Sequence, residues 1–316
     1  MARPSFAIGQ NRVRPGFRQE VGLPIAKLVT GEDVTLPVLV LHGREDGPTV
    51  WVDAAIHGDE VGGVDIIRRV LADIDPKTLH GTLIAVPIVN VHGFMAGDRY
   101  LPDRRDLNRS FPGTARGSLA GRVAHLMMTE IVAPSDVGID LHTGSDHRTN
   151  LPQIRADLDD PATRSLAETF GAPVMIHART RDGSLRHAAR EHGATVLLYE
   201  GGEALRFDDW AIDAGVAGVN RVLASLGMIE GETSPDRSSV ESRKTGWVRA
   251  GASGIARIEC ALGAEVDAGD RLGVISNSFG RRLATIKAAR TGVVIGRLEA
   301  PLVNRGDAVV HIAEIV

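Results

Sequence analysis

The sequence predicts an α/β fold in which a mixed, mostly parallel sheet carries helices on both faces and a small all-β unit follows. Two observations predict this. Between residues 38 and 201, short apolar runs alternate with segments of helical periodicity, and the runs are apolar on both faces. After a polar stretch at residues 230–244, the chain changes to short β-rich runs separated by glycines.

The expected elements follow one another along the chain. After a β extension over about residues 1–45, we expect strands at residues 48–56, 81–90, 136–142, 172–178 and 194–200. We expect helices at residues 61–74, 119–132, 163–170, 184–192 and 208–226. The chain therefore divides into a larger domain, residues 1–235, and a smaller one, residues 236–316.

The smaller domain contains two similar segments, LGAEVDAGDRLGVI and LEAPLVNRGDAVVHI, each with a strand, a Gly-Asp turn and a strand. This duplication resembles the barrel-sandwich fold of biotinyl/lipoyl carriers. A carrier has its modified lysine on the hairpin after the first copy, where this chain has Phe279. The nearest lysine, Lys287, falls in a later strand. We therefore expect the carrier fold without the carrier function.

Composition excludes several classes of protein. The 316 residues carry a formal net charge of -4, which does not suggest nucleic acid or a membrane surface as a partner. No apolar run reaches the ~18 residues that a membrane span needs. The single cysteine, Cys260, fits a reducing compartment, and the N-terminal residues lack the apolar run of a signal peptide. We therefore expect a cytoplasmic protein.

Polar side chains stand where predicted strands end. His57, Asn90, His142 and Glu200 each fall at the carboxyl end of a strand. In open α/β sheets, ligands bind outside the carboxyl ends of the strands. We therefore expect these side chains to lie at one site.

The site contains a ligand set that suits zinc. His57 and Glu60 are three residues apart on a turn that enters a helix, and His142 supplies the third ligand. Gly58 and Gly144 would let the backbone approach the metal closely. Either motif alone is weak, because HxxE is frequent and a lone histidine in an apolar strand is more often a core residue. Together they predict one Zn²⁺ per chain.

A carboxylate that could act as a base lies close to these ligands. Glu200 ends an otherwise apolar strand, where a carboxylate is costly to bury without a role, so we expect it to move protons. An ion pair with an arginine is the alternative. Asp140 either orients His142 or caps a loop. The histidines without such company are expected at the surface or in loops: His42, His80, His92, His125 and His192.

Residues 97–113 form an arginine-rich loop between the two metal-ligand motifs. Guanidinium groups bind carboxylates through paired hydrogen bonds and also polarise carbonyl groups, so the loop predicts an anionic substrate. A solvated run of charge is the alternative. Asn90, Asn108, Pro112 and Gly113 are turn formers that would hold the loop in one shape.

Together, HGDE, DLNRSFPG, DLHTG and the EGG after an apolar strand resemble the succinylglutamate desuccinylase/aspartoacylase family, within the zinc carboxypeptidase superfamily. The motifs cover about residues 40–230. The N-terminal extension and YEGGE are most similar to the branch that contains N-acetyl-diaminobutyrate deacetylase. The resemblance implies zinc-dependent hydrolysis of the amide bond of a small anionic N-acyl amino acid with an acetyl or succinyl group. Members of the family often associate, which leaves a homo-oligomer open.

The resemblance also implies roles for individual residues. Glu200 matches the general acid/base, and Asn108 and Arg109 match the pair that holds the substrate's carboxylate. The residues that match the zinc ligands are His57, Glu60 and His142.

Two further arginines are less firmly matched. Arg99 matches the residue that stabilises the oxyanion, but its spacing from DLNR is longer than in aspartoacylases, so Arg104 or Arg105 is an alternative. Arg190 matches a substrate-binding arginine by spacing, and Arg186 is the alternative.

Two other functions remain open at this point. One is a metallocarboxypeptidase that cleaves peptides with the same chemistry in an open cleft. The other is a non-catalytic module that binds a metal or a ligand, against which the full set of ligands and base argues.

Overall fold

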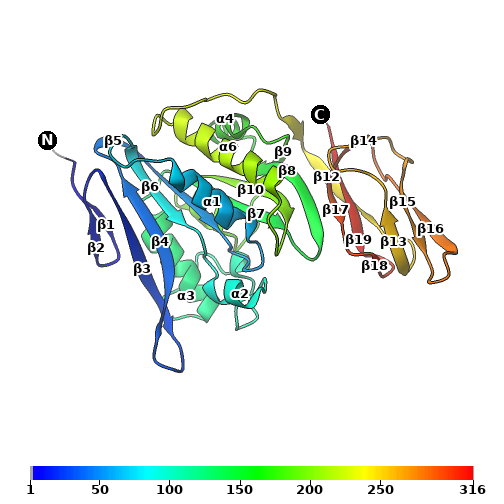
Figure 1. Ribbon diagram of the computed structural model, residues 1–316, viewed down its shortest axis with the longest axis horizontal. Coiled ribbons are helices and arrows are strands. Elements are labelled where there is room, and N and C mark those ends of the chain that lie inside the picture. Colours follow the sequence, from blue (N-terminus) through cyan, green and yellow to red (C-terminus); the bar gives the residue numbers. More distant parts are fainter. Residues whose placement is uncertain (1–2, 316) are drawn as a thin grey trace.

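The structure, a computed structural model, describes residues 3–315 and is built on one long mixed sheet (Figure 1). Met1, Ala2 and Val316, at the ends of the two expected domains, lie outside the described residues. In spatial order the strands of the larger part are β3 (Phe17–Lys27), β4 (Asp33–His42), β6 (His80–Val86), β5 (Glu45–Ala54), β7 (Val137–Gly144), β10 (Thr195–Glu203), β8 (Arg148–Ala156), β9 (Val174–His177) and β11 (Val240–Ser242).

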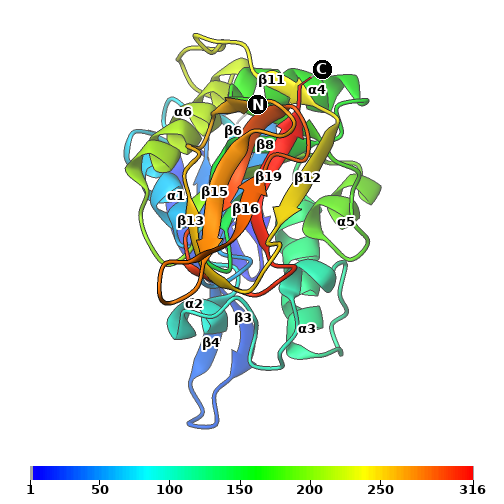
Figure 2. The ribbon, with the colours of Figure 1, turned by 90° about the vertical axis from the view of Figure 1, so that its right-hand side faces the viewer.

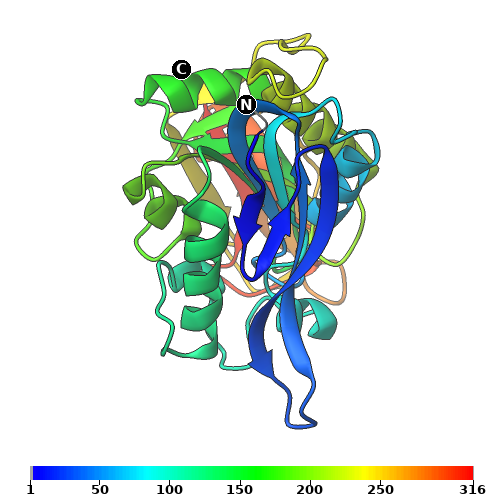
Figure 3. The same cartoon turned by 90° about the vertical axis from the view of Figure 1, so that its left-hand side faces the viewer.

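The centre of this sheet is parallel, which confirms the predicted fold class. β6, β5, β7 and β10 run parallel to one another, whereas β3, β4 and β8 join antiparallel. The N-terminal extension is β-structured as expected. It contains the hairpin of β1 (Phe6–Ile8) and β2 (Asn11–Val13), and a long β3–β4 hairpin that projects beyond the body of the molecule (Figure 3).

Helices cover both faces of the sheet. One face packs against α1 (Gly62–Ala72), α4 (Pro161–Phe170) and α6 (Asp209–Ser225), and the other against α3 (Leu119–Leu126), its π-helical continuation (Met127–Val132) and α5 (Leu185–Glu191). Each face has its own apolar core, which explains why the strands read as apolar on both sides. Within residues 3–315, no helix is long and apolar enough to cross a membrane.

One central strand, β8, was not predicted. Its sequence contains Pro152, and proline normally argues against a strand interior because it lacks the N–H. The structure resolves the conflict, since one edge of β8 changes partner at this point. Residues 148–150 pair with a strand of the C-terminal part, and residues 153–156 pair with β9. Two short helices were also missed, α2 (Val91–Ala96) and the 3₁₀ turn Leu107–Arg109.

The C-terminal part is all-β and has its own core, as predicted (Figure 2). The large sheet supplies β12 (Lys244–Arg249), β19 (Ala308–Glu314), β17 (Gly292–Leu298) and the short β14 (Glu265–Val266). A second sheet contains β16 (Arg282–Lys287), β15 (Arg271–Ser276), β13 (Gly254–Ile258) and β18 (Leu302–Val303).

Several details match the predicted duplication. The two Gly-Asp turns share one backbone conformation, with φ of 100° at Gly269 and 97° at Gly306. Phe279 lies exposed between β15 and β16, at the hairpin position expected. The large sheet nevertheless runs without a break from β8 into β17, so the domain boundary at residue 235 stays a prediction.

Candidate active site

Two histidines and one glutamate converge at the carboxyl ends of β5 and β7. Glu60 Oε1 lies 2.8 Å from His57 Nδ1, and Glu60 Oε2 lies 2.7 Å from His142 Nδ1. All three residues are buried. The backbone N–H of Thr143 donates to the same carboxylate at 3.2 Å. The turn after β5 and the end of β7 thus bring HGDE and DLHTG together as predicted.

A second carboxylate faces the other nitrogen of each ring. Asp106 Oδ1 lies 3.2 Å from His57 Nε2, and Asp140 Oδ1 lies 2.8 Å from His142 Nε2, although the latter pair is not aligned as a hydrogen bond. These carboxylates favour a proton on Nε2, which leaves the Nδ1 lone pairs for a shared ligand. Asp140 thus faces the His142 ring, and within residues 3–315 its carboxylate makes no loop-capping hydrogen bond.

These contacts shift the protonation equilibria strongly. Burial by itself lowers the pKa of both imidazoles, but the nearby carboxylates outweigh it. The pKa of His57 is raised by Glu60 and Asp106, and that of His142 is raised well above its usual value by Asp140 and Glu60. Although burial opposes it, the two histidines hold the pKa of Glu60 far below its usual range.

The three residues suit a divalent metal ion. Their candidate ligand atoms all lie within 4.8 Å of one another, and two imidazole nitrogens with one carboxylate are a common zinc donor set. The negative charge that raises the histidine pKa values would equally stabilise a cation between the rings. The donor chemistry and the orienting carboxylates therefore fit a zinc site.

Among Arg99, Arg104 and Arg105, it is Arg99 that reaches this centre. It lies 3.3 Å from Glu60 Oε1 and 3.2 Å from Asp106 Oδ2, and it lines the cavity above the ligands. Arg104 and Arg105 are exposed and do not line that cavity. Asn90 does not line it either. Its amide caps α2 and donates to the Arg99 carbonyl at 3.2 Å, so it holds the loop in place.

Asn108 and Arg109 also line the cavity. The Asn108 Oδ1 accepts from the backbone N–H of Leu185 at 2.9 Å, at the start of α5. Because Oδ1 already accepts this hydrogen bond, the amide Nδ2 of Asn108 is the group that can donate to a ligand. The Arg109 guanidinium donates to the Asn108 carbonyl, and within residues 3–315 it has no carboxylate within ion-pair distance. The pair thus offers donors to an anion.

Glu200 lies next to the ligands, on the neighbouring strand. It stands in register with His142 on β7 and lines the same cavity. The Asn150 Nδ2 donates to its Oε2 at 2.6 Å, and Arg155 Nε lies 3.5 Å from its Oε1. Both partners come from β8. Glu200 therefore does have an arginine neighbour, as the ion-pair alternative expected, but its carboxylate also lines the cavity over the ligands.

The structure separates the two arginines proposed on α5. Arg190 is 56% exposed, pairs with Asp157 at 2.5 Å and does not line the cavity. Arg186 does line it. Burial, followed by nearby Arg155, lowers the pKa of Arg186 to about 10. The alternative position is thus the one that reaches the site.

Other expectations resolve differently. Gly58 and Gly144 do serve close approach, but to backbone: a Cβ at Gly58 would lie 2.1 Å from the Gly93 carbonyl carbon, and one at Gly144 would lie 2.2 Å from the Arg148 oxygen. His42 is buried, not at the surface, with Thr82 Oγ1 at 2.9 Å.

The cavity over the ligands has a volume of about 630 Å³ and is strongly cationic. Eight arginines line it, against two carboxylates, Glu60 and Glu200. The C-terminal unit supplies one wall through Trp247, Arg249 and Ala308. Trp247 stacks on His311 with ring centroids 4.5 Å apart, so the ring of His311 supports the Trp247 side chain in this wall.

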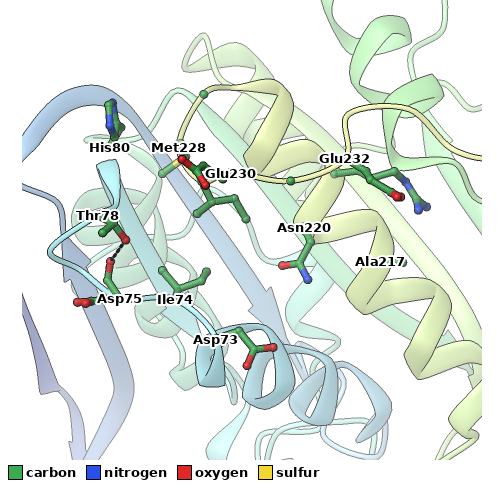
Figure 4. Close-up of a pocket in the computed structure, with 14 residues that line it drawn as sticks. Asp73, Ile74, Asp75, Thr78, His80, Ala217, Asn220, Met228, Glu230 and Glu232 are labelled. Atoms are coloured by element: carbon green, nitrogen blue, oxygen red, sulfur yellow. Dashed lines mark hydrogen bonds between the residues drawn. The ribbon is translucent and has the colours of Figure 1, made fainter.

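A larger hollow of about 790 Å³ lies elsewhere, between the end of α1 and α6 (Figure 4). Acidic side chains are spread around its rim, including Asp73, Asp75, Glu230 and Glu232. It contains neither the ligand set nor Glu200. We therefore assign the chemistry to the smaller cavity.

Sequence comparison gives an independent result. A family model described as the succinylglutamate desuccinylase/aspartoacylase catalytic domain matches residues 46–226. The N-alpha-acetyl-L-2,4-diaminobutyric acid deacetylase of Halomonas elongata is 29% identical over 297 residues, which cover 90% of this chain and 86% of that protein. A succinylglutamate desuccinylase of Burkholderia mallei is 31% identical over 180 residues, half of each chain.

Solved structures agree over nearly the whole length. The succinylglutamate desuccinylase/aspartoacylase from Rhodobacter sphaeroides has a TM-score of 0.85 at 28% identity and covers 96% of this chain and 97% of its own. The product-bound ectoine utilization protein EutE (DoeB) from Ruegeria pomeroyi has a TM-score of 0.86 at 27% identity and covers 99% and 98%. The likeness therefore includes the C-terminal unit.

Proposed function

Because the chain belongs to the succinylglutamate desuccinylase/aspartoacylase family, we propose that it is a zinc-dependent deacylase that hydrolyses the amide bond of a small N-acyl amino acid. The observation that carries the proposal is the convergence of His57 Nδ1, Glu60 and His142 Nδ1 beside the carboxylate of Glu200. The deacetylase and desuccinylase activities named for the relatives support the class of reaction.

The residues divide the work between metal binding and proton transfer. His57, Glu60 and His142 would hold the zinc, which supplies a Lewis acid that activates water at neutral pH. Glu200 takes a proton from the attacking water and later delivers it to the leaving amine. Arg99, which lines the cavity beside Glu60, donates to the oxyanion that develops on the carbonyl, an effect worth ~3–4 kcal/mol per donor in comparable sites.

The lining of the cavity supports an anionic substrate. Asn108 Nδ2 and the Arg109 guanidinium are free to hold a carboxylate, and Arg186 adds a second positive group. N-acetyl-diaminobutyrate, the substrate type named for the Halomonas relative, carries an ammonium group. Within the cavity the carboxylates that could pair with it are Glu60 and Glu200, which the mechanism already uses. We therefore favour acidic N-acyl amino acids.

A substrate panel tests this function. Purified protein is incubated, with and without added zinc, with N-acetylaspartate, N-succinylglutamate, N-acetyl-diaminobutyrate and a tripeptide, and the released amine is measured. We expect zinc-dependent release from an acidic N-acyl amino acid and slower cleavage of the tripeptide, because the wall formed by Trp247 and Arg249 narrows the cavity.

Each other outcome has a definite meaning. Tripeptide cleavage at an equal rate would favour the metallocarboxypeptidase. Fastest release from N-acetyl-diaminobutyrate would contradict the preference for acidic substrates while keeping the reaction. One bound zinc without turnover of any amide would contradict the deacylase and favour a binding module.

A further inference from the structure

The orientation of Glu200 depends on a single amide. Asn150 is buried and donates to Glu200 Oε2 at 2.6 Å, the shortest contact that this carboxylate makes. The other neighbour, Arg155, lies 3.5 Å away and its Nε is not aligned as a hydrogen bond. A donor this close restricts the carboxylate to one rotation, which matters for a group that must accept and then return a proton.

Asn150 is itself held from the C-terminal unit. It is the residue of β8 that pairs with Gly296 on β17. A Cβ added at Gly296 would lie 2.9 Å from Asn150 Oδ1, a separation that real Cβ contacts essentially never show. Gly296 thus leaves just enough space for the Asn150 amide in the orientation that points its Nδ2 at Glu200.

The strand pairing does not by itself require a glycine at residue 296. Gly296 has a backbone conformation that other residues can adopt, since its φ is not in the left-handed region, and it does not line the cavity. Any residue with a Cβ would press on the Asn150 amide here, whereas the next neighbours, His311 Cβ at 3.4 Å and the Thr149 oxygen at 3.6 Å, would be in ordinary contact. The close approach therefore points to the side chain of Asn150 as the feature that the glycine accommodates.

We propose that Asn150 is a positioning residue for Glu200 and that the C-terminal unit fixes its orientation through Gly296. This inference rests on the proposed function of Glu200 as the general acid/base. It assigns the C-terminal unit a part in catalysis as well as in forming the wall of the cavity.

The test is a double-mutant cycle on the full-length, zinc-loaded protein with the best substrate of the panel. We expect Asn150→Ala to lower kcat ~10–100-fold, the range of a hydrogen bond to a charged group, with KM and zinc content little changed. Asn150→Asp keeps the shape but replaces the donor with a negative charge, so it should be at least as impaired. A role in packing alone predicts that the aspartate variant stays active.

Gly296→Ala supplies the second arm. We expect it to lower kcat several-fold alone and to have no further effect in the Asn150→Ala background, where the atom it would displace is gone. Gly251→Ala is the matched control in the same unit, because its Cβ would meet nothing closer than Ala284 at 3.7 Å. Additive effects of Asn150→Ala and Gly296→Ala on kcat would overturn the proposal.

A crystal structure of the Gly296→Ala variant gives a readout that needs no substrate. We expect the Asn150 amide to be rotated and Glu200 to be displaced or present in two orientations. An unchanged Glu200 would contradict the positioning role even if the protein deacylates. Conversely, a displaced Glu200 in a protein that deacylates nothing would leave the geometry correct and the proposed reaction wrong.

Discussion

At the scale of single residues, the site is defined by which ring nitrogen of each histidine faces Glu60. Asp106 and Asp140 each face an Nε2, so both rings turn Nδ1 toward Glu60. The sequence predicted the three ligands because they sit in compact motifs. It did not predict Asp106 as a partner of His57, although DLNR was singled out, because a contact across 49 positions leaves no local pattern.

Glu200 gives the first prediction. Glu200→Gln should retain one zinc per chain but lose ~10² or more in kcat, because the amide cannot accept the proton of water. Glu203→Gln is a matched control, since Glu203 lies on the same strand, pairs with Arg206 and does not line the cavity. Steady-state kinetics and metal analysis check both variants. Full activity of Glu200→Gln would remove this residue from the mechanism.

The metal ligands give a second prediction. His142→Ala should lose most of its bound zinc, because two ligands do not hold the ion. His192→Ala, an exposed histidine at the end of α5, should keep it. Metal content per chain after dialysis against a weak chelator is the measurement. Stoichiometric zinc in His142→Ala would show that a different ligand set operates.

At the scale of elements, α5 separates two arginines that sequence spacing could not. Arg186 lines the cavity, whereas Arg190, one turn later, points to Asp157. Arg186→Met should raise KM for an acidic substrate ~10-fold or more, since a charged hydrogen bond to the substrate is lost. Arg190→Met, the matched change, should leave kcat/KM nearly unaltered. The reverse pattern would restore the original assignment by spacing.

The strands show where prediction from sequence succeeds and where it fails. β5, β7 and β10 were predicted because they are apolar on both faces and end in polar residues. β8 was missed because Pro152 argues against a strand, and only the change of partner along its edge makes that proline acceptable. Because β8 was missed, its residues Asn150 and Arg155, which contact Glu200, were missed as well.

At the scale of the whole molecule, acid should weaken the C-terminal unit. Burial, followed by Arg155 and Arg290, lowers the pKa of His311 to about 3. His311 therefore stays neutral in the folded state at pH values where it is protonated in the unfolded chain, that is, below about pH 6.5. Stability from this residue is complete above that pH and falls by about 1.4 kcal/mol per pH unit as the pH drops toward 3.

The variant His311→Phe isolates this effect. Phenylalanine keeps a ring against Trp247 but has no titrating nitrogen. We expect the urea midpoint of the wild type to decline between pH 6.5 and 4 more steeply than that of His311→Phe. Circular dichroism at several pH values measures both. Parallel declines would assign the acid sensitivity to other groups.

The pairing of β8 with β17 also bears on how the protein is made. Almost half of the chain separates Asn150 from Gly296, and a ribosome that adds ~5–20 residues per second needs on the order of 10 s to cross that interval. During that time part of one edge of β8 is open, as in strands prone to aggregation. Until β17 is made, Asn150 lacks its Gly296 partner, and we expect premature stop codons after residue 235 to yield less soluble protein with lower kcat.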